Sequence, residues 1–538
     1  MRADLVAGVT VGVVALPLAL AFGASAGVGP AAGMVTAVVA GVAAAVFGGS
    51  NVQVSGPTGA MAVVLAPIVA AHGTAAIALV SVLAGLIVLV SGLLRLGRVV
   101  TLLPWPVVEG FTLGIAAIIA LQQIPTAVAI SVETGRGTLL TAADAVRRVF
   151  MVADLAPTLW TLGTVAVVIV VMFLLPRLHA SIPASLIAVA AVTVLAEVLG
   201  VPIARIGGLP SSLPLPAFPA ADIGTVRDLS GAALAVAALA AIESLLSARV
   251  AASMTRVPCQ PDRELVGQGL ASIVSGIFGG MPATGAIART AVNVRSGART
   301  RLAAIAHSLV ILAVIYLATG PVSRIPLAAL AGVLIATSLR MLPVATVRAV
   351  FGAGRGAALT FTVTAVVTIS LDLVQAIEIG LLVSAVLALW HLARAAAVHR
   401  EPLPGPARTG DERIALFRLE GAMFFGAADR VFSTIAGRAD VDGVDVVILR
   451  LSGVGMLDST GARGLGELIE NLESAGKTVL VKGVQNQHRR ILDGVGAIDA
   501  LRHHTHLLDD LDTAVTHARS HLLARTEKEL PDGRARPR

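Results

Sequence analysis

Long apolar runs separated by short polar connections make up the chain as far as about residue 398. Most runs hold roughly 15–22 residues, and a helix of that length spans about the 30 Å hydrocarbon core of a bilayer. Two runs, at 57–71 and 285–294, are too short to cross it alone. The pattern predicts an all-α polytopic membrane domain with about fourteen transmembrane segments, two of them half-helices.

The two short runs share a motif. Residues 55–60 read Ser-Gly-Pro-Thr-Gly-Ala and residues 281–286 read Met-Pro-Ala-Thr-Gly-Ala. The match predicts an internal repeat, at about 1–200 and 222–398, with seven segments in each copy. In a membrane protein, paired broken helices at matching positions are typical of a secondary transporter that binds its substrate near the midplane.

The composition agrees with a membrane location. Apolar residues make up 56% of the 538 residues, charged residues 14%, and the mean hydropathy is +0.87. Arginines concentrate in the short loops that would be cytoplasmic if the N-terminus is inside, as the positive-inside bias requires. We expect a multi-pass protein of the bacterial inner membrane with both termini in the cytoplasm. The basic charge then reflects orientation in the lipid bilayer and gives no reason to expect a nucleic-acid partner.

A proline-rich segment, residues 401–406, marks a change in composition. Residues 399–411 read as a linker. Apolar strand-like runs then alternate with helix patterns over 412–520, which predicts a small cytoplasmic α/β domain. Residues 521–538 are polar and read as a disordered tail.

The broken helices supply a way to bind an anion without many side chains. A helix N-terminus offers unpaired N–H groups and about half a positive charge. Two such ends facing each other would form an anion pocket. The predicted contact residues are Thr58, Gly59 and Ala60 in the first copy and Thr284, Gly285, Ala286, Ile287 and Ala288 in the second.

Two ionisable residues lie inside apolar runs, where charge is costly and therefore indicates function. Glu243 is central in the run 230–249 and shares a helix face with Ser247, while Arg289 falls in the first turn of the second half-helix. We predict an ion-coupling role for Glu243 and Ser247 and an anion-binding role for Arg289. The alternative is that Glu243 and Arg289 form a buried ion pair that only fixes helix packing.

The chain resembles the SulP family of anion transporters with a C-terminal STAS domain. The residues that carry the resemblance lie at 4–8, 15–23, 47–50, 54–59, 264–269, 275–282 and 289–293. The family implies a 7+7 inverted repeat with a core and a gate domain, a homodimer, a coupling-ion site at the carboxylate matching Glu243, and an anion contact at the arginine matching Arg289.

The resemblance also bears on substrate and coupling ion. Sodium-dependent bicarbonate transporters of the family typically carry Asp, with Thr four residues later, and no arginine on the tenth helix. Glu243, Ser247 and Arg289 look more like the proton-coupled sulfate carriers. We therefore expect proton-coupled sulfate transport by alternating access. Sodium-coupled bicarbonate symport, dicarboxylate carriage or anion exchange, and an anion channel remain alternatives.

No further cofactor is expected beyond the coupling ion, H⁺ with Na⁺ as the alternative. No nucleophile–base pair or phosphate loop occurs, so we do not expect an enzyme. In the C-terminal domain, Ser459 matches the phosphorylated serine of related anti-sigma antagonists, although Asp458 and Ser459 could simply cap a helix. The run His503-His504-Thr505-His506 reads as solvated surface, and no metal site is expected. The cytoplasmic partner of this domain is unknown.

Overall fold

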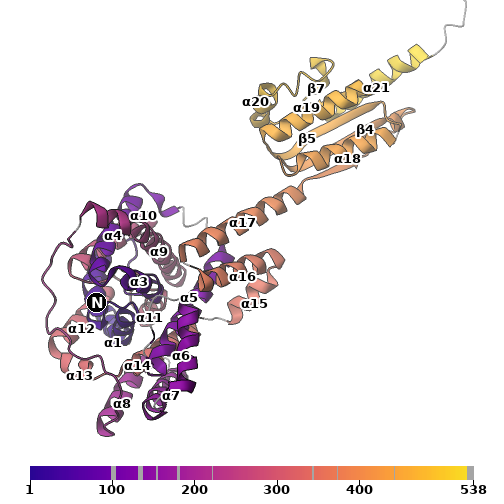
Figure 1. Ribbon diagram of the computed structural model, residues 1–538. Coiled ribbons are helices and arrows are strands. Elements are labelled where there is room, and N and C mark those ends of the chain that lie inside the picture. The colour runs from indigo at the N-terminus through magenta and orange to yellow at the C-terminus, as the bar shows by residue number, and fades with distance from the viewer. Residues whose placement is uncertain are drawn as a thin grey trace, which may run out of the picture. The chain divides into compact units, whose positions relative to one another are not determined.

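The computed structural model describes residues 1–98, 104–130, 132, 137–152, 155–178, 182–220, 222–341, 344–371, 373–441 and 443–529 (Figure 1). The chain divides into two compact units, Met1–Ser384 and Ala385–Arg538. We describe each unit by itself.

The first unit is almost entirely helical. Its helices are α1 (Arg2–Ser25), α2 (Pro30–Phe47), α3 (Gly59–His72), α4 (Ala75–Leu93), α5 (Trp105–Ala127), α6 (Thr138–Val152), α7 (Leu155–Leu178), α8 (Ala184–Val198), α9 (Ile223–Thr255), α10 (Pro261–Ile277), α11 (Ile287–Arg295), α12 (Leu302–Leu317), α13 (Thr319–Ser323), α14 (Leu327–Arg340), α15 (Val344–Gly352), α16 (Arg355–Ser370) and α17 (Leu373–Ala395), the last of which runs across the unit boundary.

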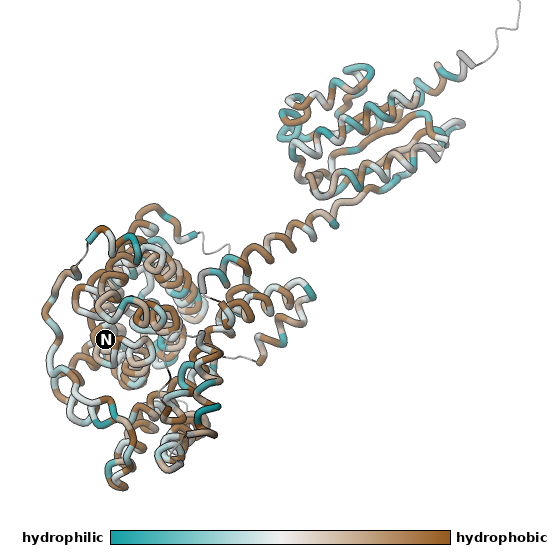
Figure 2. Tube along the Cα trace, viewed as in Figure 1, coloured by the Kyte–Doolittle hydropathy of each residue, from teal (hydrophilic) through white to brown (hydrophobic). Residues whose placement is uncertain are grey.

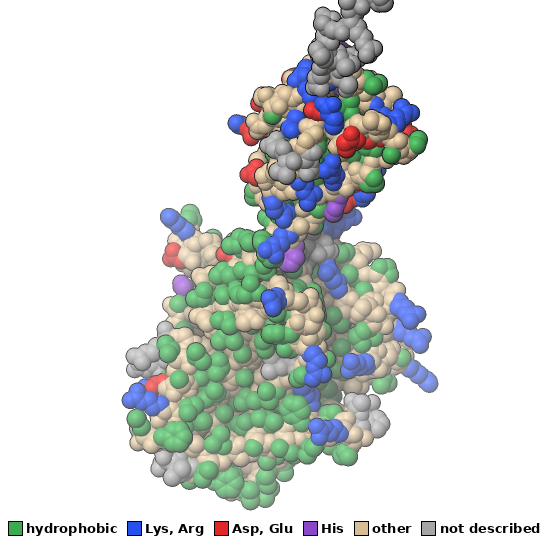
Figure 3. Space-filling model, turned by 90° about the vertical axis from the view of Figure 1, so that its right-hand side faces the viewer, with side chains coloured by type: hydrophobic (Ala, Val, Ile, Leu, Met, Phe, Trp, Pro, Cys, Tyr) green, Lys and Arg blue, Asp and Glu red, His purple; other side chains and the backbone are tan. Residues whose placement is uncertain are grey.

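Among the described residues, 8 helices are long and apolar enough to cross a membrane, and four shorter apolar helices accompany them. Hydrophobic residues run along these helices in Figure 2, and the face of this unit seen in Figure 3 carries a broad expanse of hydrophobic side chains. Such a surface fits contact with lipid chains. The membrane domain predicted from the apolar runs is confirmed as mostly helical.

The two short runs form short helices, as predicted. α3 begins at Gly59, with the side chain of Thr58 as its N-cap, and ends before Gly73, whose φ of 77° suits glycine. α11 is only 9 residues long, too short to cross a bilayer alone. Between the two helix starts, strands β1 (Ser55–Gly56) and β2 (Thr284–Gly285) pair antiparallel, a contact that the sequence pattern did not predict.

Close helix packing in this unit depends on small residues. A side chain at Gly85 of α4 would come within 2.7 Å of the carbonyl oxygen of Gly269 in α10. One at Gly8 of α1 would come within 2.5 Å of the carbonyl oxygen of Ala303 in α12. Glycine lets these backbones approach, which is how helices associate where the solvent is as apolar as the side chains.

The second unit contains a five-stranded sheet in the order β3-β4-β5-β6-β7, with β3 antiparallel to β4 and the other pairs parallel. Its elements are β3 (Ala397–Glu401), β4 (Ile414–Met423), α18 (Ala428–Val441), β5 (Val446–Leu457), α19 (Ser459–Ser474), β6 (Thr478–Lys482), α20 (Asn486–Gly494), β7 (Leu507–Leu508) and α21 (Leu511–Glu529), with the 3₁₀ turns η2 (Asp411–Arg413) and η3 (His504–His506).

Alternate residues of the central strands face opposite sides of the sheet. Phe417 and Leu449 pack in a core with α18 and α19, while Leu416 and Ile448 pack in a second core with α21. Two apolar faces, each covered by helices, are what a mostly parallel sheet requires. The predicted α/β domain is therefore observed.

Two boundary predictions and one prediction of surface exposure in this unit are wrong. β3 pairs with β4, so part of the predicted linker 399–411 belongs to the sheet. α21 continues to Glu529 because Leu522 is buried against the sheet, so residues 521–529 are no disordered tail, and 530–538 lie outside the described residues. His506 is 1% exposed, so the run 503–506 is not fully solvated.

Candidate functional site

The site forms where the two strand-to-helix junctions meet. Ser55 pairs with Gly285, and Gly56 pairs with Thr284. The N–H of Ala286 donates to the carbonyl oxygen of Val54 at 2.9 Å. These backbone bonds hold the start of α3 beside the start of α11.

Glu243, on α9, joins the two junctions. The hydroxyls of Thr58 and Thr284 each donate to Oε2 of Glu243 at 2.8 Å, and the two hydroxyl oxygens lie 3.2 Å apart. Within the described ranges, Oε1 of Glu243 accepts no hydrogen bond. One carboxylate therefore contacts the threonines of the two Thr-Gly-Ala motifs.

Arg289 is 3% exposed and lies in the first turn of α11. One guanidinium nitrogen, Nη2, donates to the carbonyl oxygen of Pro57, while the buried Nη1 has no hydrogen-bond partner among the described residues. No ion pair within 4.0 Å joins Arg289 to Glu243 in that part of the chain, although their charges interact. A simple buried ion pair is thus not observed, and the arginine retains a free donor.

The N–H groups at the two helix starts differ in how they are used. The Thr58 side chain caps the N–H of Met61, leaving those of Gly59 and Ala60 uncapped. α11 has no side-chain cap, and the N–H of Ala286 is already bonded. Ile287 and Ala288, in the first turn of α11, are exposed.

Ser247 is buried, but its hydroxyl lies 3.2 Å from that of Thr290 and makes no bond to Glu243 within the described residues. Thr290 also accepts from the N–H of Val54 at 3.1 Å. Ser247 therefore braces α9 against α11 one turn away from the carboxylate. Ser459 lies in the C-terminal unit, exposed at the start of α19, where Asp458 caps the helix through the N–H of Gly461.

Several buried polar residues around the site escaped the sequence analysis. Gln53 donates to the carbonyl oxygen of Ser244, and a side chain at Gly285 would come within 1.7 Å of its Nε2. Gln268 donates to the hydroxyl of Ser55 at 2.6 Å. Gln53 lies in the polar stretch before the first motif, and Gln268 lies in the apolar run 264–279. A polar side chain beside or inside apolar sequence was the available signal.

His307, on α12, is another missed residue. It is fully buried, and neither ring nitrogen has a hydrogen-bond partner among the described residues. Its charge would interact with that of Arg289. Like Glu243, it is an ionisable residue inside an apolar run, here 302–319, so it carried the same signal.

A cavity of about 380 Å³ opens beside the segment that leads into β1. Asn51, Val52, Cys259 and Arg299 are among its lining residues, and Glu243 and Arg289 are not. It lies between the end of α9, the α9–α10 loop and the segment after α11, so it borders the site's supporting elements and does not contain the carboxylate.

Comparison with known proteins shows which family the chain belongs to. The model of the sulfate permease family matches residues 1–366, and that of the STAS domain matches residues 406–514. The chain belongs to the sulfate permease family. It is a mostly helical anion transporter of the membrane with a C-terminal STAS domain, and the family is one of transporters, not enzymes.

Relatives of the permease cover nearly its whole length. It is 30% identical over 502 residues to the putative sulfate transporter YvdB of Bacillus subtilis, across 92% of this chain and 93% of that protein. It is 31% identical over 520 residues to the bicarbonate transporter BicA of Synechocystis, across 92% and 90%.

Solved structures show the same fold. SLC26A9 superposes with a TM-score of 0.82 at 16% identity, covering 98% of the permease and 91% of that chain. The transmembrane domain of a cyanobacterial bicarbonate transporter, BicA, superposes with a TM-score of 0.62 at 31% identity, covering 71% and 97%. The SLC26-like architecture of the membrane domain is therefore shown.

Proposed function

We propose that the permease is a secondary active transporter that carries sulfate with protons across the bacterial inner membrane by alternating access. One observation carries the proposal. The carboxylate of Glu243 bonds to matching threonines of the two half-helix starts, and the free guanidinium nitrogen of Arg289 lies at one of those starts. A titratable group and an anion-binding group thus share one junction.

The anion would bind to the free donors at this junction. Uncapped N–H groups of α3 and α11 and Nη1 of Arg289 are donors, and oxyanions accept hydrogen bonds from helix N-termini and from guanidinium. Sulfate would draw Arg289 away from Glu243 electrostatically and so favour the protonated carboxyl. Binding of the anion and of the proton would then reinforce each other.

The transport cycle would use the two repeats. We assign seven membrane segments to each: α1, α2, α3, α4, α5, α7 and α8, then α9, α10, α11, α12, α14, α16 and α17. In this assignment α3 and α11 are the third segment of their repeats, and both are broken at the site. Inverted repeats of this kind support rocking of one bundle against another around a fixed site.

Sodium-coupled bicarbonate transport is the second candidate. Oε2 of Glu243 and the hydroxyl oxygens of Thr58 and Thr284 lie 2.8–3.2 Å from one another, and hard cations prefer oxygen ligands. The BicA relatives carry bicarbonate by name. These three oxygens would bind Na⁺ as readily as the carboxylate would bind a proton.

Transport assays on reconstituted protein distinguish proton-coupled sulfate transport from sodium-coupled bicarbonate transport. We expect labelled sulfate to accumulate in proteoliposomes under an inward proton gradient, with or without Na⁺, and labelled bicarbonate to accumulate less. Protein-free liposomes are the control. Uptake that follows a sodium gradient at fixed pH and favours bicarbonate would overturn the leading proposal in favour of the second candidate.

Cys259 offers a test of the proposed orientation, with both termini in the cytoplasm. It is the single cysteine of the chain, half-buried in the loop between α9 and α10, which would then face the cytoplasm. A membrane-impermeant maleimide should label it in inside-out vesicles and spare it in intact cells. Labelling of intact cells would contradict the orientation, and Cys259→Ser should remove the signal.

The same experiment has an expected pH dependence. Burial, with a smaller contribution from the nearby charge of Glu264, raises the pKa of the Cys259 thiol above its usual value. The thiolate is the reactive form. Labelling in inside-out vesicles should therefore be slower than that of free cysteine at pH 7 and should keep rising with pH beyond the range in which free cysteine levels off.

A further inference from the structure

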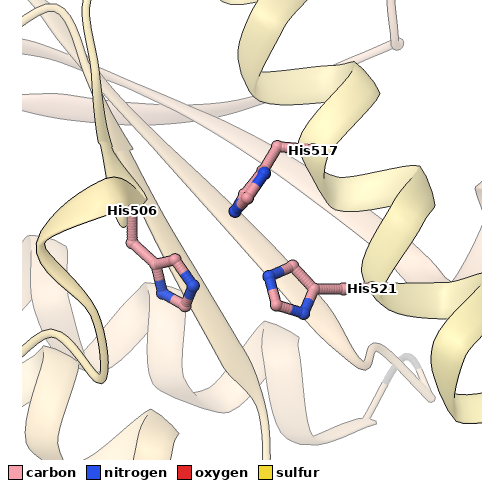
Figure 4. A group of neighbouring side chains, drawn as sticks. All are labelled: His506, His517 and His521. Carbon is pink, nitrogen blue, oxygen red and sulfur yellow. The ribbon is translucent and has the colours of Figure 1, made fainter.

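Three histidines of the C-terminal unit converge on one point, remote in sequence from the transport site. His506 ends the 3₁₀ turn η3, while His517 and His521 lie four residues apart on α21. Residues at that spacing share a helix face. Figure 4 shows the three rings pointing into the same space between η3 and α21, and one ring nitrogen from each lies within 4.8 Å of the others.

These rings have polar atoms without partners. Among the described residues, Nδ1 of His506, Nε2 of His517 and Nε2 of His521 are buried and make no hydrogen bond. His506 is 1% exposed. Most buried polar groups in proteins are hydrogen-bonded, and an unsatisfied one costs stability. Three unsatisfied nitrogens in one cluster therefore need an explanation.

The rings pack edge to face, with centroids 4.9–5.5 Å apart. Burial, with the neighbouring histidines, lowers the pKa of His506 to about 4 and also lowers that of His521. Imidazole binds a metal in its neutral form. Ring packing alone fills the space but leaves all three nitrogens unpaired.

We propose that His506, His517 and His521 bind a divalent transition metal, with Zn²⁺ as the best match. Zn²⁺ binds imidazole nitrogen at about 2.0–2.1 Å, which puts tetrahedral ligands about 3.3 Å apart. The nitrogens need to close from at most 4.8 Å, a change that rotation of the side chains can supply. Ni²⁺, Co²⁺ and Cu²⁺ also favour imidazole.

The metal would link two parts of the unit. His506 directly precedes β7, the edge strand paired with β6, and α21 covers one face of the sheet. A bond from η3 to two successive turns of α21 would hold the C-terminal helix on that face. Three protein ligands leave a fourth position for water or another donor.

The prediction of no metal site rested on the run 503–506, which has no carboxylate or cysteine cluster beside it in sequence at zinc spacing. The missing partners lie on α21, brought to η3 by the fold. A His-x-x-x-His pair on one helix was the local signal that went unused.

Metal binding is best tested on the full-length protein, purified through a tag without histidine and stripped with a chelator. We expect Zn²⁺ to bind at one saturable site per chain by isothermal titration and to raise the melting temperature of the C-terminal unit. Co²⁺ should give the visible d–d absorption of a tetrahedral site. Absence of saturable Zn²⁺ binding to the wild type would overturn the proposal and leave ring packing as the explanation.

Single substitutions assign the ligands. His517→Gln and His521→Gln should each weaken Zn²⁺ binding at least tenfold and abolish the Co²⁺ spectrum, while retaining the wild-type far-ultraviolet circular dichroism. His504→Gln, at an exposed residue two positions from His506, is the matched control and should bind as the wild type does. An equal loss of Zn²⁺ binding in His504→Gln would contradict the assignment. Unchanged Zn²⁺ binding in His517→Gln and His521→Gln would contradict it as well.

Discussion

Glu243→Gln is expected to abolish gradient-driven accumulation of sulfate while leaving part of sulfate binding and exchange. Glutamine keeps the volume and can still accept from the hydroxyls of Thr58 and Thr284, but it cannot gain or lose a proton. Uptake in proteoliposomes should fall to the level seen without a proton gradient. Counterflow exchange of labelled for unlabelled sulfate should persist.

The matched control is Glu197→Gln, which removes an exposed carboxylate of α8 paired with Arg205. It should accumulate sulfate as the wild type does. A Glu243→Gln protein that still concentrates sulfate under a proton gradient would show that coupling does not pass through this carboxylate.

Arg289→Ala is expected to weaken sulfate binding about 10- to 100-fold, the equivalent of roughly 1.5–3 kcal/mol for a hydrogen bond to a charged group. The reason is the free Nη1 at the start of α11. Titration calorimetry on detergent-purified protein measures the change. Arg289→Lys keeps the positive charge but lacks the forked N–H donors of the guanidinium. Its sulfate affinity should lie between that of the wild type and that of Arg289→Ala.

Arg295, exposed in the last turn of the same helix, provides the control substitution. Arg295→Ala should leave sulfate affinity unchanged. Because Arg289 also donates to the carbonyl oxygen of Pro57, each variant should be checked for monodisperse elution and an unchanged melting temperature. A folded Arg289→Ala protein with wild-type affinity would exclude this arginine from the anion site.

Much of the fold of the membrane domain could be predicted from local sequence signals. Pro57 and Thr58 marked the start of α3, because proline and a threonine cap favour a helix start there, and the matching Thr-Gly-Ala motif at 284–286 directly precedes α11, which has no side-chain cap. The charge of Glu243 and Arg289 inside apolar runs marked the junction. Because these signals depend only on neighbouring residues, they can be recognised in the sequence without knowledge of the fold.

Contacts between distant segments could not be predicted in this way. The pairing of β1 with β2 joins two-residue strands, too short for any periodicity to reveal. Ser247 shares a face with Glu243 as expected, yet its partner is Thr290 on another helix. Periodicity gives the face of a helix, while the partner on that face depends on how helices cross.

The C-terminal boundaries failed for a related reason. Composition at residues 399–401 and 521–529 is polar enough to read as linker and tail. β3 is an edge strand with little buried surface, and α21 buries a single stripe that includes Val515 and Leu522. Polar edges of a domain resemble linkers until their partners are known.

Proton uptake on sulfate binding tests the central claim most directly. Titration calorimetry of wild-type protein in buffers of different ionisation enthalpy gives the number of protons taken up per sulfate bound. The account predicts close to one proton for the wild type at a pH where Glu243 is ionised in the free protein and protonated once sulfate is bound, and none for Glu243→Gln. Tight sulfate binding with no proton uptake by the wild type at any pH, or uptake that survives in Glu243→Gln, would contradict it.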